Sequence, residues 1–266
     1  MVKYKDVYYD KYLLDNLGGF KKAVLNKNTS FVMVIDGRSG MGKTTLANQL
    51  GHFFDDNYCL DKIFWEPRKF LEGLEKARKG DFILFDEAMI LSSRSAMSEI
   101  NRMVVMAMSM IRSKQLFICF CVNSIFDLDR NLALSRADFL LHVYGDNLGD
   151  RGNFTAFFRA RGDIDRIKSL YLRGKKYYSY SQPRANFFGS FGKRFIVDEG
   201  EYERRKQEGV NSFLSKGEIL GKRERKYRDI CKKMIKTNLL TRANCEDMGL
   251  IKKTYHDLKS EMEDED

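Results

Sequence analysis

One eight-residue segment restricts the fold and chemistry of this chain more than any other. Residues 37–44 read Gly-Arg-Ser-Gly-Met-Gly-Lys-Thr and match the pattern G-x-x-x-x-G-K-[ST] in full. The apolar run 31–35 comes just before it and predicts a buried strand, and residues 45–54 are compatible with a helix. A strand, a glycine-rich turn and a helix in this order distinguish a phosphate-binding loop, or P-loop, from a chance match.

The residue types in this loop are those that phosphate binding requires. Glycines let the backbone wrap a phosphate chain with its N–H groups turned inward, at a helix N-terminus where the dipole favours anions. Lys43 would reach the β- and γ-phosphates, and the Thr44 hydroxyl would bind Mg²⁺. We therefore expect nucleotide contacts from Gly37, Arg38, Ser39, Gly40, Met41, Gly42, Lys43, Thr44 and Thr45.

A second element follows about 40 residues later, where the apolar run 82–85 ends in Asp86 and Glu87. A strand that ends in carboxylates brings them to the edge where open α/β sheets bind ligands. Asp86 is expected in the Mg²⁺ shell, and Glu87 is expected to act as general base for a water that attacks the γ-phosphate. The pair could instead cap a following helix, but the P-loop upstream favours the catalytic interpretation.

A third apolar run, 116–122, ends in Asn123. A polar residue at the tip of a strand beside the P-loop strand could contact the γ-phosphate or orient the attacking water, or it could cap the next turn. Arg112, Arg130 and Arg136 are candidates for an arginine finger supplied to a neighbouring subunit's ATP, and Arg136 is the preferred one. Each of them could also be a surface salt-bridge residue. A finger that works in trans requires an oligomer.

Residues 31–45, 82–87 and 117–123, in this order, resemble the P-loop ATPases that carry an additional strand and a catalytic glutamate, the division of RecA-like and AAA+-like proteins. Further strands are expected at 62–65 and 139–144, an antiparallel addition at 153–158, and helices at 68–79 and 98–112. The resemblance implies a RecA-like α/β fold with a mostly parallel sheet in the order 5-1-4-3-2, ATP and Mg²⁺ as cofactors, and a homo-oligomeric ring.

Within that division the chain is similar to DNA translocases, conjugation and packaging ATPases, and zonular occludens toxin-like ATPases. Asn123 stands where translocases of this branch often have glutamine, which leaves an AAA+-like assignment open. The chain lacks the N-K-x-D motif of GTPases. A small-molecule kinase with an arginine-rich lid stays open, because residues 151–173 contain five arginines.

The net charge of +10 is unevenly distributed, with about +9 in residues 151–266. Such an asymmetry favours a polyanion partner, although a solvated basic face would give the same count. In residues 174–190, lysines and arginines alternate with aromatic side chains. This composition suits single-stranded nucleic acid, or equally an arm that packs on the core.

The last part of the chain reads as a small basic helical unit with an acidic tail. Residues 240–258 resemble a helix-turn-helix, although Asn244 stands where a hydrophobic residue is normal. An amphipathic helix pair that binds protein is the alternative. We expect three domains, an ATPase core at 1–175, an arm and linker at 176–220, and the helical unit at 221–266. The expected contacts to DNA, whether single- or double-stranded, are Lys252, Lys253, Thr254 and His256.

No membrane span is expected, because the longest apolar stretch, residues 103–111, is far shorter than the roughly 20 residues a bilayer needs. A signal peptide is not expected, because the first ten residues carry four charges and three tyrosines, and the five cysteines match neither a disulfide framework nor a zinc site. We therefore expect a cytoplasmic protein, in the host cytoplasm if it is viral.

The functional hypothesis is Mg²⁺-dependent ATP hydrolysis coupled to DNA translocation or packaging for a virus or plasmid, with a viral or plasmid protein as a further partner. The alternatives are an ATP-dependent DNA loader or regulator that does not translocate, and a phage-assembly or protein-remodelling ATPase.

Overall fold

The computed structural model describes residues 1–86, 104, 107–108, 111–145, 152–159, 164–209, 211, 231–232, 234–237, 241–242, 255–256, 258–260 and 262. Contacts divide the chain into two units, Met1–Gln207 and Glu208–Asp266. The expected boundary after residue 175 falls inside the first unit. Most of the expected helix 98–112 lies outside the described residues.

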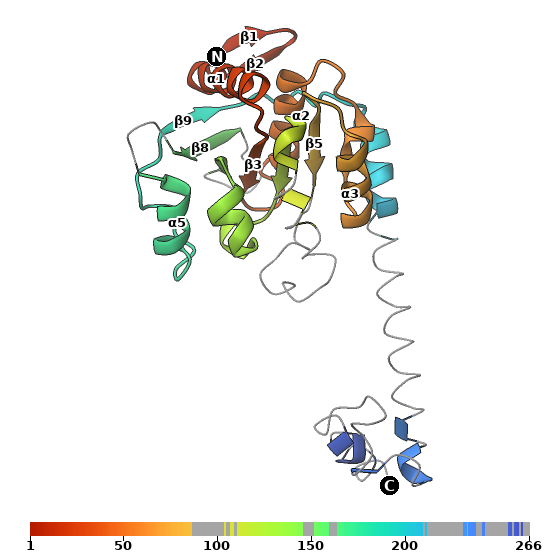
Figure 1. Cartoon of the computed structure of the whole chain (residues 1–266). Helices are drawn as coiled ribbons and strands as arrows, with labels where there is room; N and C mark the ends of the chain where they lie inside the picture. Colours follow the sequence, from red (N-terminus) through yellow and green to blue (C-terminus); the bar gives the residue numbers. More distant parts are fainter. Residues whose placement is uncertain are drawn as a thin grey trace. The chain divides into compact units, whose positions relative to one another are not determined.

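A seven-stranded sheet in the order β4-β5-β6-β3-β7-β8-β9 forms the centre of the first unit (Figure 1). Its strands are β3 (Phe31–Asp36), β4 (Ile63–Phe64), β5 (Phe82–Phe85), β6 (Phe117–Cys121), β7 (Phe139–Tyr144), β8 (Asn153–Phe158) and β9 (Phe187–Ser190). The strands β4, β5, β6, β3 and β7 are parallel, and β8 and β9 are added antiparallel. Numbered along the chain, the five parallel strands have the predicted order 5-1-4-3-2, so the α/β fold class is confirmed.

The strand β3 lies at the point where the sheet order reverses, with β6 on one side and β7 on the other. Met33 of β3 pairs with Cys119 of β6 and with Phe139 of β7. Since these strands run in one direction, their carboxyl ends meet at a single edge of the sheet. Ligands of open α/β sheets bind outside this edge, at such a reversal point.

Helices cover both faces of the sheet, which explains why its parallel strands read as continuous apolar runs. The helices are α1 (Lys11–Lys27), α2 (Lys43–Phe54), α3 (Pro67–Lys76) and α5 (Arg166–Gly174). Met33 and Ile35 pack with residues of α1 and α2, whereas Val32 and Val34 pack with residues of α3 and α5. Alternate residues of one strand therefore belong to the two opposite cores.

Two parts of the fold were not anticipated from the sequence patterns. Residues 1–30 form a two-stranded sheet, β1 (Val2–Tyr4) and β2 (Val7–Tyr9), followed by α1. Asp10 caps α1, since its carboxylate accepts a hydrogen bond of 3.1 Å from the backbone N–H of Leu13. The strand β9 comes from the stretch that we expected to be an arm.

In the second unit, Cys231, Ile235, Tyr255 and Leu258 form a small buried cluster. Tyr255 and Leu258 of this cluster belong to the segment 240–258 that resembles a helix-turn-helix. His256 is exposed, and residues 252–254 lie outside the described part of the chain. None of the described helices is both long enough and apolar enough to span a bilayer.

Candidate nucleotide site

The P-loop follows β3 directly, and two of its glycines are needed for its shape. Gly37 has φ of +138°, and a Cβ at this position would lie 2.2 Å from the carbonyl oxygen of Val143. Gly42, with φ of +90°, occupies the N-cap position of α2. Within the described residues no side chain caps this end of α2. The helix N-terminus therefore faces the loop, as phosphate binding requires.

The ammonium group of Lys43 lies at the mouth of the loop. Its Nζ donates hydrogen bonds to the backbone oxygens of Gly37 at 2.7 Å and Arg38 at 3.0 Å. It also lies 3.4 Å from Oδ1 of Asn123, at the tip of the neighbouring strand β6. The structure thus brings Lys43 and Asn123 together, 80 residues apart in the chain. A cation held here can meet the negative charge of a bound phosphate chain.

The Thr44 hydroxyl oxygen lies 3.3 Å from each carboxylate oxygen of Asp86. Asp86 follows β5 and is buried, and its backbone N–H donates to the carbonyl of Phe64 at 2.9 Å. Hydroxyl and carboxylate oxygens are the ligand atoms that Mg²⁺ prefers, usually together with retained waters. These two side chains therefore fit a magnesium ion.

A cavity of about 420 Å³ connects these groups. Eight of the residues predicted for the site line this cavity: Ser39, Gly40, Gly42, Lys43, Thr44, Thr45, Asp86 and Asn123. Gly37 and Arg38 contribute the carbonyl oxygens described above, and Met41 is buried in the core. Glu87 lies outside the described residues.

The cavity has a second wall that the sequence analysis missed. Residues 199–209 are helical, and the cavity is also lined by Phe195, Glu199, Tyr202, Glu203 and Lys206. No local sequence pattern linked this segment to the nucleotide site. The one local signal in this segment is the aromatic Tyr202 among charged residues.

Tyr202 is the most buried residue of this wall, with 2% of its surface exposed. Its hydroxyl donates a hydrogen bond to Oδ2 of Asp86, and its ring lies 5.4 Å from Trp65 and 5.2 Å from Phe195. Burial, with the Asp86 charge added, raises the pKa of the Tyr202 phenol above its usual value. The hydroxyl therefore stays protonated and acts as a donor to the carboxylate.

A second buried carboxylate, Asp36, lies immediately before the P-loop. It accepts hydrogen bonds from the backbone N–H of Ile125 at 2.7 Å and from the Tyr180 hydroxyl, and His142 Nδ1 lies 2.9 Å away. The Tyr180 ring stacks on the His142 ring with centroids 3.6 Å apart. Burial, with the Asp36 charge added, also raises the pKa of Tyr180. Tyr180 thus joins the segment after α5 to the base of the loop.

The candidate arginine finger lies away from the P-loop of its own chain. Arg136 ends the π-helical turn η6 (Leu132–Arg136), which precedes β7 and so lies at the amino ends of the parallel strands. The six residues of β7 span about 20 Å. Arg112, in the 3-10 turn η4 (Ile111–Lys114), also precedes a strand of the sheet, β6. Both arginines therefore lie at the edge of the sheet opposite the P-loop.

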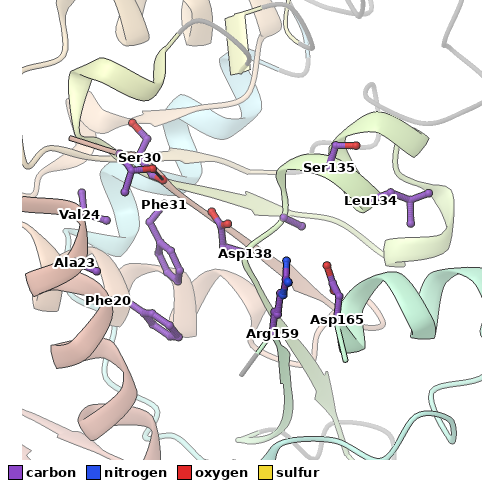
Figure 2. A pocket seen from close by; sticks show the side chains of 12 residues that line it. Phe20, Ala23, Val24, Ser30, Phe31, Leu134, Ser135, Asp138, Arg159 and Asp165 are labelled. Atoms are coloured by element: carbon purple, nitrogen blue, oxygen red, sulfur yellow. Dashed lines mark hydrogen bonds between the residues drawn. The ribbon is translucent and has the colours of Figure 1, made fainter. Parts of the chain in front are cut away.

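A second cavity, of about 500 Å³, lies at this amino edge (Figure 2). Figure 2 shows Phe20 and Phe31 on one side of it and Arg159 and Asp165 on the other. Its Asp138 accepts a hydrogen bond of 2.9 Å from the backbone N–H of Val32 and so joins the starts of β3 and β7. This cavity shares no lining residue with the P-loop cavity.

In the described part of the chain, no group of three or more histidine, cysteine, aspartate or glutamate side chains could hold a metal ion. Cys59, Cys119, Cys121 and Cys231 are free thiols. The candidate magnesium site therefore depends on the Thr44 hydroxyl and the Asp86 carboxylate.

No protein-family model and no curated protein matches the sequence. Among solved structures, the chain is similar to the N-terminal domain of zonular occludens toxin from Neisseria meningitidis, with a TM-score of 0.40 and 17% sequence identity. The similarity covers 66% of this chain and 98% of that domain. Because the TM-score is below 0.5, the candidate nucleotide site is assigned from the side chains and distances described above.

Proposed function

We propose that this protein is a Mg²⁺-dependent ATPase that binds its nucleotide in the P-loop cavity. The observation that carries the proposal is the convergence of three groups in that cavity, the Lys43 ammonium, the Thr44 hydroxyl and the Asp86 carboxylate. A cation and a helix N-terminus bind phosphates, and the hydroxyl–carboxylate pair fits a hydrated divalent cation.

Hydrolysis would require several residues with separate tasks. The loop N–H groups and Lys43 bind the phosphates and neutralise the charge that develops on them. Thr44 and Asp86 would hold Mg²⁺, which supplies further neutralisation when it is bound. Glu87 would accept a proton from the attacking water while the bond between the γ-phosphorus and the ADP oxygen breaks. Asn123, which faces Lys43, would orient that water or contact the γ-phosphate.

We further propose that the ATPase acts on DNA, in translocation or packaging for a virus or plasmid. Support comes from residues 166–197, which contain eight lysines and arginines but no aspartate or glutamate. Tyr177 and Tyr178 are exposed in the turn after α5, with 74% and 50% of their surfaces accessible. Cations next to exposed aromatic rings suit a single strand, through phosphate contacts and base stacking.

The exposed turn is close in sequence to Tyr180, which contacts the residue before the P-loop. Tyr178 donates a hydrogen bond of 2.6 Å to Asp127, and Tyr180 donates to Asp36 beside the P-loop. A strand bound at the turn would therefore lie two residues from a contact with the loop. This short connection could couple the DNA to the nucleotide state.

Two further elements of the proposal concern partners. His256 is exposed in the second unit, and with Lys252, Lys253 and Thr254 it would supply additional DNA contacts. Arg136 would reach the nucleotide of a neighbouring subunit, in a homo-oligomeric ring, since it lies at the opposite edge of its own sheet. A viral or plasmid protein would be a further partner of such a ring.

ATP turnover measured with and without single- and double-stranded DNA at low salt tests these proposals. We expect Mg²⁺-dependent hydrolysis that single strands stimulate, and none in the variant Lys43→Ala. No hydrolysis by the unmodified protein would refute the ATPase. Slow turnover with a large effect of ATP on DNA affinity would indicate a loader, and equal turnover with and without DNA would indicate a protein-remodelling or assembly ATPase.

A further inference from the structure

The Tyr202–Asp86 contact is the feature of the cavity that P-loop chemistry does not explain. Tyr202 is separated from Asp86 by 116 residues, is buried, and directs its hydroxyl at Oδ2 of that carboxylate. Trp65 and Phe195 hold its ring in place. Thr44, the other candidate magnesium ligand, approaches the same carboxylate from the P-loop.

We propose that Tyr202 is a positioning residue for the metal, one that orients the Asp86 carboxylate for the Mg²⁺ that accompanies the nucleotide. The inference rests on the proposed nucleotide-binding function and adds a residue from outside the P-loop and the Asp86 strand.

The number of lone pairs on the carboxylate makes this role compatible with metal binding. An ionised carboxylate offers about four acceptor positions on its two oxygens. Tyr202 occupies one position, on Oδ2, and Thr44 can use another. The remaining positions can accept a metal ion or its bound water without displacing the tyrosine. The tyrosine restricts rotation of the carboxylate, as hydrogen-bond partners of metal ligands generally do.

The variant Tyr202→Phe isolates this role, because it removes the hydroxyl and keeps the ring between Trp65 and Phe195. Tyr171→Phe is the matched control. Tyr171 has the same exposed fraction of 2%, and its hydroxyl also donates a buried hydrogen bond, 3.2 Å to the carbonyl of Leu128. Tyr171 belongs to α5 and does not line the P-loop cavity.

The experiment titrates Mg²⁺ into each protein at a fixed concentration of a fluorescent ATP analogue and measures binding of the analogue. We expect Tyr202→Phe to raise the midpoint Mg²⁺ concentration about tenfold, since loss of such partners costs about 10- to 100-fold in metal affinity. Binding in EDTA should be unchanged, and Tyr171→Phe should match the unmodified protein. An unchanged midpoint for Tyr202→Phe, or an equal rise in the control, would overturn the proposal.

A second measurement needs no variant. Trp65 is the single tryptophan of the chain, and its ring lies 5.4 Å from that of Tyr202. Mg²⁺ added to the analogue-bound protein should change Trp65 emission at the midpoint seen for binding, because Asp86, Tyr202 and Trp65 are in consecutive contact. Emission that does not respond would count against the proposal. If the unmodified protein binds no analogue with or without Mg²⁺, the nucleotide-binding function itself is refuted.

Discussion

The Nδ1 atom of His142 lies 2.9 Å from Oδ1 of Asp36, the last residue before the P-loop. Asp36 has no exposed surface, and its other oxygen accepts hydrogen bonds from Ile125 N–H and the Tyr180 hydroxyl. One carboxylate thus joins β3, β7, the turn after β6 and the segment after α5. The base of the loop is held by this network as well as by the sheet.

Replacement of Asp36 by alanine should lower the free energy of unfolding by about 3 kcal/mol. The substitution removes the acceptor of the buried Ile125 N–H, a partner of the Tyr180 hydroxyl and the contact to His142, and each unsatisfied buried group costs about 1–3 kcal/mol. Urea unfolding followed by circular dichroism measures the change. The control is Asp15→Ala, at an exposed position of α1, which should change stability by less than about 0.5 kcal/mol. Similar losses for both variants would contradict the assigned role of the network.

The variant Gly37→Ala should lose nucleotide binding, because the added Cβ would lie 2.2 Å from the Val143 carbonyl oxygen and its φ of +138° disfavours a side chain. Equilibrium binding of a fluorescent nucleotide measures the loss. Gly19→Ala in α1 is the control, because an added Cβ there meets nothing within 4 Å. That variant should be more stable by about 0.5–1 kcal/mol and bind nucleotide normally. Normal binding by Gly37→Ala would refute the assigned loop geometry.

The variant Tyr177→Ala should weaken binding of an oligothymidine by about 1–3 kcal/mol, the usual contribution of one stacked base. Fluorescence anisotropy at low salt measures the affinity. Tyr8→Ala is the control, because Tyr8 is also exposed, with 54% of its surface accessible, but belongs to β2. Equal affinity of the two variants would exclude a stacking role for the turn after α5.

The roles proposed for Lys43 and Glu87 predict different effects on nucleotide binding and on ATP turnover. Lys43→Ala should weaken nucleotide binding and reduce turnover at least about 100-fold, as loss of one preorganised donor to a developing charge does. Glu87→Gln should bind Mg²⁺ and ATP normally but turn over about 10²- to 10⁴-fold more slowly, since the general base is lost. Single-turnover hydrolysis and equilibrium binding, measured side by side, check both. A Glu87→Gln variant with full turnover would assign the base to another residue.

The sheet was predictable because its signals are local. Each parallel strand is a short apolar run, and the P-loop and Asp86 mark the strands whose carboxyl ends carry the site. The position of β6 between β3 and β5 came from the resemblance to ATPases with an additional strand and is confirmed. The short strand β9 was missed. It has four residues, and a Cβ on its Gly189 would lie 2.5 Å from the Phe154 ring, so close packing replaces an apolar pattern there.

The tyrosine contacts to Asp36 and Asp86 could not be predicted, because they join residues far apart in the sequence. Tyr180 meets Asp36 across 144 residues and Tyr202 meets Asp86 across 116. The periodicity of apolar residues is a local signal and does not indicate contacts between such distant residues. The tyrosines at 177, 178 and 180 read as one aromatic cluster, yet the structure exposes the first two and places the third against a carboxylate. The composition of this stretch indicated aromatic residues but not which of the tyrosines are exposed and which one contacts Asp36.

The same two tyrosines limit how far the chain can be shortened from its C-terminal side without removing hydrogen-bond donors to two buried carboxylates. A truncation at residue 175 would remove Tyr180 and Tyr202 and leave Asp36 and Asp86 without these donors in the protein interior. A fragment that keeps both donors therefore has to extend through the helix at 199–209.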